Sequence, residues 1–274
     1  MPVAAKLRAT GRFSAFLVTT LFLMPFYKFG RSPDFQRLVA GLWFRCVGHI
    51  IGVKLQARGQ AYPVDKGNRP EFPVLYVANH VSWLDIIVLG MKLDAVFVAK
   101  SDVADWPLLG RLASMRQCIF VSRQPVQVER EVRMIRERLA SGCNVILFPE
   151  GTTGEGGRLL PFKSSLLAAV DGLPEVRVQA VSIAYPDPVN GGADTSLAWY
   201  GETRMLPHLW SVLGRADAPA RLQFHPLLTA SDFPCRKTLA AACRSHISGG
   251  IDRMLSSAQG RELFSQENRG QVMT

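Results

Sequence analysis

The sequence predicts an α/β fold, in which a mixed sheet is covered by helices and preceded by an N-terminal membrane-associating helical pair. Three observations predict it. From residue 74 onward, short runs of β-branched residues alternate with longer segments of helical periodicity, which is typical of an α/β sheet. The chain has 274 residues, a length that an open α/β sheet usually fills as one domain. Roughly the first fifty residues are more apolar than the rest and have helical spacing.

The chain opens on an apolar stretch at residues 13–27, preceded by Lys6, Arg8 and Arg12. As a helix it would be about 22 Å long, shorter than the ~30 Å hydrocarbon core of a bilayer. The basic start and short apolar region also fit a signal peptide. No small-x-small cleavage site follows, so a retained anchor is favoured.

A second helical stripe follows at residues 38–51, with Arg37, Arg45 and His49 off the stripe. The pattern fits an amphipathic helix packed on the core as well as one in contact with a membrane. Because it adjoins the first apolar stretch and basic residues flank Trp43, we favour a helical pair seated in the bilayer interface. The expected organisation is membrane-associating helices at 1–58, an α/β domain at 59–260 and a polar tail at 261–274.

The elements of the α/β domain follow from hydrophobic periodicity and from the turn residues between the runs. Strands are predicted at residues 74–78, 95–99, 119–122, 145–148, 176–185, 197–200 and 221–227. Helices are predicted at residues 83–91, 107–115, 126–141, 164–171 and 236–257.

Charge and cysteine content limit the possible partners. The net charge of +10 indicates an anionic partner, such as nucleic acid, an anionic bilayer or a phosphorylated substrate. Basic residues are scattered between apolar runs and form no stripe interleaved with aromatic residues, so no nucleic-acid partner is predicted. The five cysteines include no Cys-x-x-Cys pair, which favours buried free thiols in a reducing compartment. No metal or cofactor is predicted.

The most informative segment is Asn79-His80-x4-Asp85, directly after the predicted strand at 74–78. A histidine oriented by a carboxylate can take a proton from a weak nucleophile. The geometry requires His80 in the strand-to-helix turn and Asp85 in the first helical turn. Ser82 would then be the N-cap and Asp85 the residue at N3. The same pattern also fits a capping carboxylate beside a loop histidine, with no catalytic role.

A second polar segment, Glu150-Gly151-Thr152-Thr153, follows the predicted strand at 145–148. Ligands of open α/β sheets bind beyond the carboxyl ends of strands, so this turn is a candidate binding site for a polar head group. A tight exposed turn with no ligand would have the same composition. Arg123 and Lys163 each fall just beyond a strand or turn, where a phosphate-bearing substrate would require a cation. The chain has no Gly-x-Ser-x-Gly segment, which excludes a serine hydrolase of that type.

Five blocks occur in order: Asn79-His80-x4-Asp85, Trp106-Pro107-Leu108-Leu109-Gly110, Ile119-Phe120-Val121-Ser122-Arg123, Phe148-Pro149-Glu150-Gly151-Thr152 and Leu160-Pro161-Phe162-Lys163. Taken together they resemble the glycerolipid acyltransferases typified by 1-acyl-sn-glycerol-3-phosphate (lysophosphatidic acid) acyltransferase, in particular the bacterial branch. The resemblance covers residues 74–185. It implies transfer of a fatty acyl group from acyl-CoA or acyl-carrier protein, as co-substrate, to a lysophospholipid acceptor. The expected acceptor is the sn-2 hydroxyl of 1-acyl-sn-glycerol-3-phosphate, which gives phosphatidic acid in phospholipid biosynthesis at the cytoplasmic face of the inner membrane.

The resemblance also implies roles for individual residues. His80 would be the general base and Asp85 its orienting partner. Substrate-binding roles fall to Arg123, Glu150, Gly151, Thr152, Thr153 and Lys163. The family commonly has Arg where this chain has Thr153. Since an Arg binds phosphate bidentately, its replacement points to lyso-ornithine lipid as the alternative acceptor. A non-enzymatic protein that binds anionic membranes is the alternative from another class.

Overall fold

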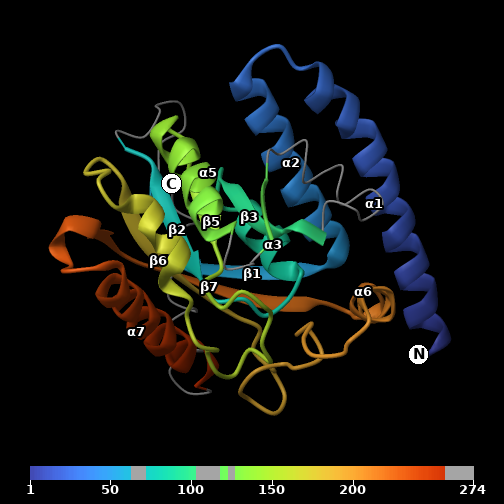
Figure 1. Ribbon diagram of the computed structural model, residues 1–274. Helices are drawn as coiled ribbons and strands as arrows, with labels where there is room; N and C mark the ends of the chain where they lie inside the picture. Colours follow the sequence, from blue (N-terminus) through green and yellow to red (C-terminus); the bar gives the residue numbers. More distant parts are fainter. Residues whose placement is uncertain (63–71, 103–117, 123–126, 257–274) are drawn as a thin grey trace, which may run out of the picture.

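The computed structural model describes residues 1–62, 72–102, 118–122 and 127–256, and Figure 1 gives its arrangement. In chain order the elements are α1 (Val3–Phe29), α2 (Pro33–Ile51), β1 (Val53–Arg58), β2 (Val74–Ala78), α3 (Leu84–Gly90), β3 (Val96–Lys100), β4 (Ile119–Val121), α5 (Val128–Ala140), β5 (Val145–Leu147), η3 (Ser164–Val170), β6 (Arg177–Ala184), α6 (Met205–Gly214), β7 (Ala218–Thr229), η4 (Ala230–Asp232) and α7 (Arg236–Leu255).

A mixed sheet forms the centre of the described part of the chain. Its seven strands lie in the order β1-β7-β6-β2-β5-β3-β4. The pair β6–β7 is antiparallel and the other neighbouring pairs are parallel. The predicted fold class, a mixed sheet covered by helices, is therefore confirmed. The carboxyl ends of β2, β3, β4, β5 and β6 meet at one edge of this sheet.

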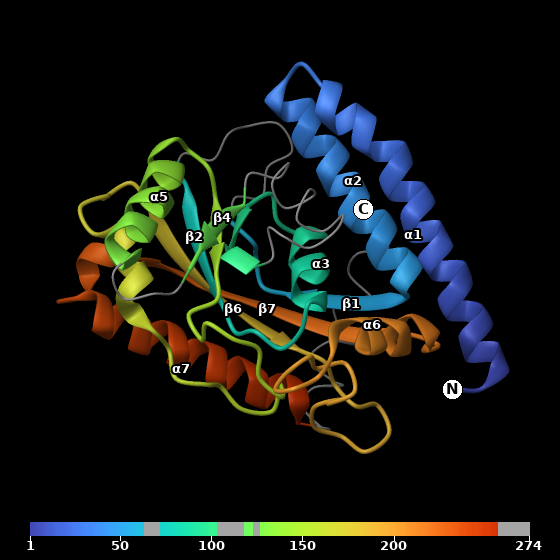
Figure 2. The same cartoon turned by 45° about the vertical axis from the view of Figure 1, so that its right-hand side comes forward.

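Helices cover both faces of the sheet, as Figures 1 and 2 show. The residues of β2 alternate between two apolar cores. Leu75 and Val77 face a core that includes residues of α5 and α7, whereas Tyr76 and Ala78 face a core built with α2 and α3. All five residues of β2 are buried, as expected for a central parallel strand covered on both faces. This explains why the run is continuously apolar.

The N-terminal helices run side by side along one end of the sheet (Figures 1 and 2). Among the described residues, α1 is the helix that is long and apolar enough to cross a bilayer, and 17% of its most apolar window is buried. It starts at Val3, well before the predicted apolar stretch, and its 27 residues give a length of about 40 Å. The predicted length of about 22 Å was therefore wrong.

Long-range contacts from Arg12 explain the earlier start of α1. The Arg12 guanidinium donates to three carbonyls at the carboxyl end of α6, those of Leu213 at 3.2 Å, Arg215 at 2.8 Å and Ala216 at 3.1 Å. A cation at the C-terminus of a helix satisfies carbonyls that have no partner within the helix. The basic residues that precede the apolar stretch are therefore part of α1, and Arg8 and Arg12 attach α1 to a helix that the sequence did not predict.

The N-terminal region also contains a strand. Ser32 caps α2, its hydroxyl accepting from the Phe35 N–H at 3.1 Å. Gly52 ends α2 in the left-handed conformation, with φ 86°, which glycine adopts without steric cost. The chain then passes directly into β1, which pairs in parallel with β7. The segment 1–58, expected to be helical, thus contributes an edge strand to the sheet.

Other predictions differ from the structure in detail. Residues 197–200 form no strand, since Leu197 lies in a turn and residues 198–200 are irregular. The predicted helix at 164–171 is the 3₁₀ helix η3. Of the cysteines, Cys243 is buried, Cys235 is exposed and the others are half-buried, so the prediction of buried thiols holds for one residue. The predicted helix at 107–115 and the polar tail at 261–274 lie outside the described residues.

Candidate active site

The predicted catalytic pair lies at the carboxyl edge of the sheet. His80 follows β2 and Asp85 lies in the first turn of α3. Nδ1 of His80 and Oδ2 of Asp85 are 2.7 Å apart. Since an ionised carboxylate can only accept, His80 carries its proton on Nδ1 and leaves the Nε2 lone pair free. The ring is thus in the tautomer that a general base requires.

The backbone around Asp85 explains how a spacing of five residues brings the two side chains together. Its Oδ2 also accepts the N–H groups of Val81 at 2.7 Å and Ser82 at 2.9 Å. The predicted capping box is half right, because the N-cap residue is Trp83 and the Ser82 hydroxyl has no hydrogen-bond partner among the residues that the structure describes. Asp85 therefore closes the turn that carries His80 and also orients its ring.

Tyr185 completes the environment of the carboxylate, and the sequence analysis missed it. Its hydroxyl donates to Oδ1 of Asp85 at 2.6 Å. Burial, followed by the nearby Asp85 charge, raises the pKa of Tyr185 well above its ordinary value, so the phenol stays protonated and donates. Asp85 is completely buried, and both of its oxygens accept. The available signal was that Tyr185 directly follows β6, at the same edge as His80.

The ring of His80 is also held from its face. It stacks on Phe148, with ring centroids 4.1 Å apart and an interplanar angle of 16°. Phe148 follows β5, the neighbour of β2 in the sheet. The side chain of His80 is 16% exposed, which leaves it accessible from one side. The imidazole therefore has a single orientation with an open approach.

Glu150 supports the same turn from β5. Its Oε1 accepts the His80 N–H and its Oε2 accepts the Leu160 N–H, both at 2.8 Å. The carboxyl group is buried, and this burial raises the pKa of Glu150. In this structure Glu150 positions the backbone of His80, and its expected contact with the acceptor stays a prediction.

The other predicted binding residues fall into two groups. Thr152 and Thr153 line the same cavity as His80. Gly151 and Lys163 line a smaller neighbouring cavity of about 60 Å³. Gly151 has a φ of 73°, and a Cβ at this position would lie 3.3 Å from Nζ of Lys163. Arg123 lies outside the described residues.

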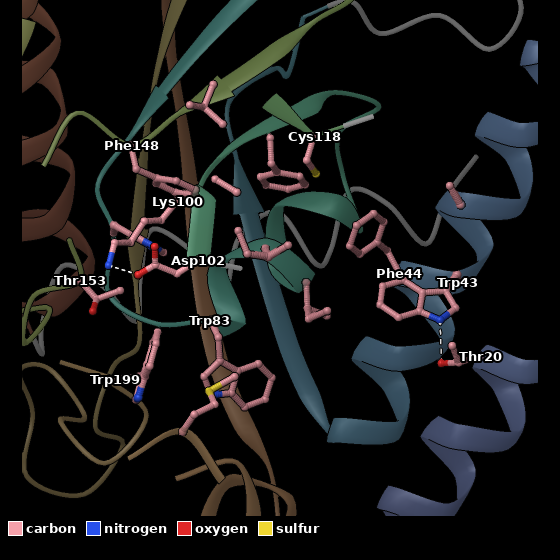
Figure 3. Close-up of a pocket in the computed structure, with 18 of the residues that line it drawn as sticks. Thr20, Trp43, Phe44, Trp83, Lys100, Asp102, Cys118, Phe148, Thr153 and Trp199 are labelled. Atoms are coloured by element: carbon pink, nitrogen blue, oxygen red, sulfur yellow. Dashed lines mark hydrogen bonds and ion pairs between the residues drawn. The ribbon is translucent and has the colours of Figure 1, made fainter. Parts of the chain in front are cut away.

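The main cavity extends from His80 to the N-terminal helices and has a volume of about 500 Å³. Figure 3 shows labelled side chains of the sheet edge at one side and Thr20, Trp43 and Phe44 of the helices at the other. Most lining residues are apolar or aromatic. Volume and lining are within the range of small-molecule sites, roughly 300–1,000 Å³. The sequence did not predict that α1 and α2 would form a wall of the cavity that contains His80.

Two tryptophans of the cavity wall are fixed by contacts far along the chain. The Trp83 indole N–H donates to Nδ1 of His208 on α6 at 3.0 Å. Burial lowers the pKa of His208, which favours the neutral ring that accepts this bond. The backbone N–H of Trp199 donates to the Val81 carbonyl at 2.9 Å. His208 therefore holds one side chain of the cavity wall in place.

Comparisons with known proteins agree with this geometry. Residues 63–184 match the model of the family described as Acyltransferase. The chain is 38% identical over 211 residues to a lyso-ornithine lipid O-acyltransferase of Rhodobacter capsulatus, covering 75% of this chain and 72% of the relative. It is 33% identical over 174 residues to a 1-acyl-sn-glycerol-3-phosphate acyltransferase of Neisseria meningitidis, covering 62% of this chain and 67% of the relative.

The fold has a solved counterpart. The crystal structure of the 1-acyl-sn-glycerophosphate acyltransferase PlsC from Thermotoga maritima superposes with a TM-score of 0.67 at 19% identity. The match covers 92% of this chain and 95% of the PlsC chain. A match of this extent includes the sheet and at least part of the N-terminal helices. On the family match, the relatives and the His80–Asp85 site together, this chain belongs to the acyltransferase family and is an acyltransferase of the lysolipid type.

Proposed function

We propose that the protein transfers a fatty acyl group from acyl-CoA or acyl-carrier protein to the hydroxyl of a membrane lysolipid. The observation that carries this proposal is the 2.7 Å contact between His80 and Asp85 at the sheet end of a large apolar cavity. A base alone would serve many reactions. A base that opens onto an apolar cavity serves a reactant with a long hydrocarbon chain.

The reaction follows from the free lone pair of His80. The lysolipid hydroxyl gives its proton to Nε2 while its oxygen attacks the carbonyl carbon of the thioester. When the tetrahedral intermediate collapses, the carbon–sulfur bond breaks and the proton passes from Nε2 to the departing thiolate. The buried carboxylate of Asp85 stabilises the imidazolium that exists between these steps. No covalent acyl-enzyme is needed, because the acceptor attacks directly.

The acceptor we propose is lyso-ornithine lipid. Thr153 supplies a hydroxyl where a bidentate guanidinium would favour a phosphate monoester, and the Rhodobacter capsulatus relative acts on lyso-ornithine lipid by name. The second candidate is the sn-2 hydroxyl of 1-acyl-sn-glycerol-3-phosphate, which would give phosphatidic acid in phospholipid biosynthesis. The Neisseria meningitidis relative favours it.

The reaction takes place, we propose, at the cytoplasmic face of the inner membrane. Large apolar side chains are exposed on α1 and α2, among them Val18, Leu21, Phe22, Phe26, Phe29, Phe35, Leu38 and Leu42. Lys28 and Arg31 lie exposed where the two helices join. An apolar helical surface next to basic residues binds an anionic bilayer. The cavity wall formed by the same helices would then receive a lipid chain directly from the membrane.

The test compares His80→Ala with wild type and with His49→Ala, a matched control because His49 is exposed on α2. Thiol release from acyl-CoA is followed in vesicles that contain lyso-ornithine lipid or lysophosphatidic acid. Loss of general-base catalysis should lower kcat by roughly a hundredfold to ten-thousandfold, and His49→Ala should retain activity. Substantial turnover by His80→Ala would contradict the mechanism. Vesicle binding by wild type with no thiol release would favour the non-enzymatic lipid-binding protein.

A further inference from the structure

We propose that Lys100 and Asp102 form a subsite for a zwitterionic amino-acid head group, in which Lys100 pairs with the carboxylate and Asp102 with the ammonium of the acceptor. This inference rests on the proposed function, and it names the residues that select the acceptor. Neither residue was among those predicted from the sequence.

The position of the pair follows from the sheet topology. Lys100 is the last residue of β3, and Asp102 follows two residues later. In the sheet, β3 lies next to β5, which lies next to β2, and the three strands are parallel. Their carboxyl ends therefore lie at the same edge. The turn that carries His80, the turn that carries Thr153 and the end of β3 are neighbours for this reason.

Both residues open into the cavity that contains His80. Among the described residues that line this cavity, Lys100 is the one basic residue of the Lys and Arg type, and Asp102 is the one acidic residue. Lys100 adds one positive charge and Asp102 one negative charge, so the two side chains together add no net charge to the cavity. Figure 3 shows the pair joined by an ion pair at the sheet end of the cavity, where Phe148 and Thr153 also lie.

A ligand can replace the ion pair between Lys100 and Asp102 at little cost in stability. The two side chains are 50% and 59% exposed, and exposed ion pairs contribute little stability because water screens them. The hydrogen bond from Lys100 lowers the pKa of Asp102, which keeps this carboxylate charged at neutral pH. A ligand with both charges can therefore separate the pair and give each residue a new partner of opposite charge.

The two candidate acceptors differ in the charges of their head groups, and the Lys100–Asp102 pair can distinguish these charges. Ornithine acylated at one amino group keeps one carboxylate and one ammonium, so it matches both residues. A phosphate monoester carries a charge of about −1.5 to −2 and no cation. It would pair with Lys100 but would face the like charge of Asp102, a source of discrimination against the wrong ligand. The pair thus favours lyso-ornithine lipid and disfavours lysophosphatidic acid.

The experiment measures kcat/KM of the full chain in vesicles with each acceptor. Asp102→Asn should lower kcat/KM for lyso-ornithine lipid by about tenfold or more, mainly through KM, since it removes a charged hydrogen-bond partner. The value for lysophosphatidic acid should stay unchanged or rise. Lys100→Gln should lower both values. Asp171→Asn and Lys237→Gln, both at exposed positions, are matched charge controls and should change neither.

A modified acceptor makes the test specific to the ammonium. Lyso-ornithine lipid acetylated on its free amine should be about tenfold poorer for wild type and should show no further loss with Asp102→Asn. An equal loss for both acceptors in Asp102→Asn, or an unchanged value for lyso-ornithine lipid, would overturn the subsite. Transfer by wild type to lysophosphatidic acid alone would overturn it while leaving acyl transfer intact. Transfer to neither acceptor would overturn the proposed function itself.

Discussion

The hydroxyl of Tyr185 donates to Oδ1 of Asp85 at 2.6 Å, and His80 uses the other oxygen of the same carboxylate. The three residues come from the ends of β6 and β2 and from the start of α3. One buried carboxylate therefore joins two strands and a helix and orients His80, the proposed general base. The pair that the sequence predicted to be catalytic is, in the structure, part of a hydrogen-bonded group of three residues.

Replacing Tyr185 should weaken catalysis without unfolding the protein. Tyr185→Phe removes one donor from Asp85, and a hydrogen bond to a charged group is worth about 1.5–3 kcal/mol. We expect kcat to fall by roughly tenfold to a hundredfold with KM little changed, measured by thiol release at saturating acyl-CoA. Tyr62→Phe, which also deletes one hydroxyl, is the matched control and should retain activity. A large KM effect with unchanged kcat would contradict this role.

Asp85→Asn should affect both catalysis and stability. The amide would stabilise the wrong tautomer of His80, so we expect kcat to fall by about a thousandfold or more. Asn also loses acceptor capacity toward the N–H groups of Val81 and Ser82, as in the loss of a helix cap, which costs about 1–2 kcal/mol. Thermal unfolding measured alongside activity separates the two effects. An Asp85→Asn protein with near wild-type kcat would exclude the proposed orientation of His80.

Arg12→Ala should release α1 from α6. The variant leaves the carbonyls of Leu213, Arg215 and Ala216 without their guanidinium donor, and we expect a loss of about 1–3 kcal/mol. Hydrogen exchange should then rise at the carboxyl end of α6. Arg31→Ala, at an exposed position between α1 and α2, is the control. Unchanged exchange in α6 would show that these hydrogen bonds contribute little.

His225 should make the stability of the protein depend on pH. Burial, with His246 and Arg253 nearby, lowers the pKa of His225 from 6.5 to about 4. Its Nε2 lies 2.7 Å from the Ser182 hydroxyl, and its ring stacks on His246. Between these two pKa values the unfolded chain binds a proton at this site that the folded protein excludes. The free energy of unfolding should therefore fall as pH drops from about 6.5 to 4, by at most ~1.4 kcal/mol per pH unit.

This dependence is measured by urea unfolding in detergent across pH 4–7, comparing wild type with His225→Gln. The variant has no titrating group at this position, so its free energy of unfolding should change less over the same range. An identical slope in both proteins would assign the dependence to other groups.

The sequence predicted the strands that carry the site because these strands are buried. In β2, β5 and β6 burial on both faces requires continuous apolar runs, and such runs are visible without a structure. It missed β1, whose residues are mostly half-buried at the sheet edge and whose pattern is correspondingly mixed. The aromatic residues at 197–200 have a pattern typical of a strand, but in the structure Trp199 and Tyr200 line the cavity.

The sequence by itself determined the α/β class, the His80–Asp85 pair and the resemblance to acyltransferases, because these depend on local spacing and on strand burial. Only the tertiary structure decided which distant residues support the pair. Tyr185, Phe148 and Glu150 contact His80 or Asp85 from 65 or more positions away along the chain. The closure of the cavity by α1 and α2 and the place of Lys100 and Asp102 in it were decided in the same way. Parallel strands bring their carboxyl ends to one edge whatever their separation in sequence, and no local pattern encodes which side chains meet there.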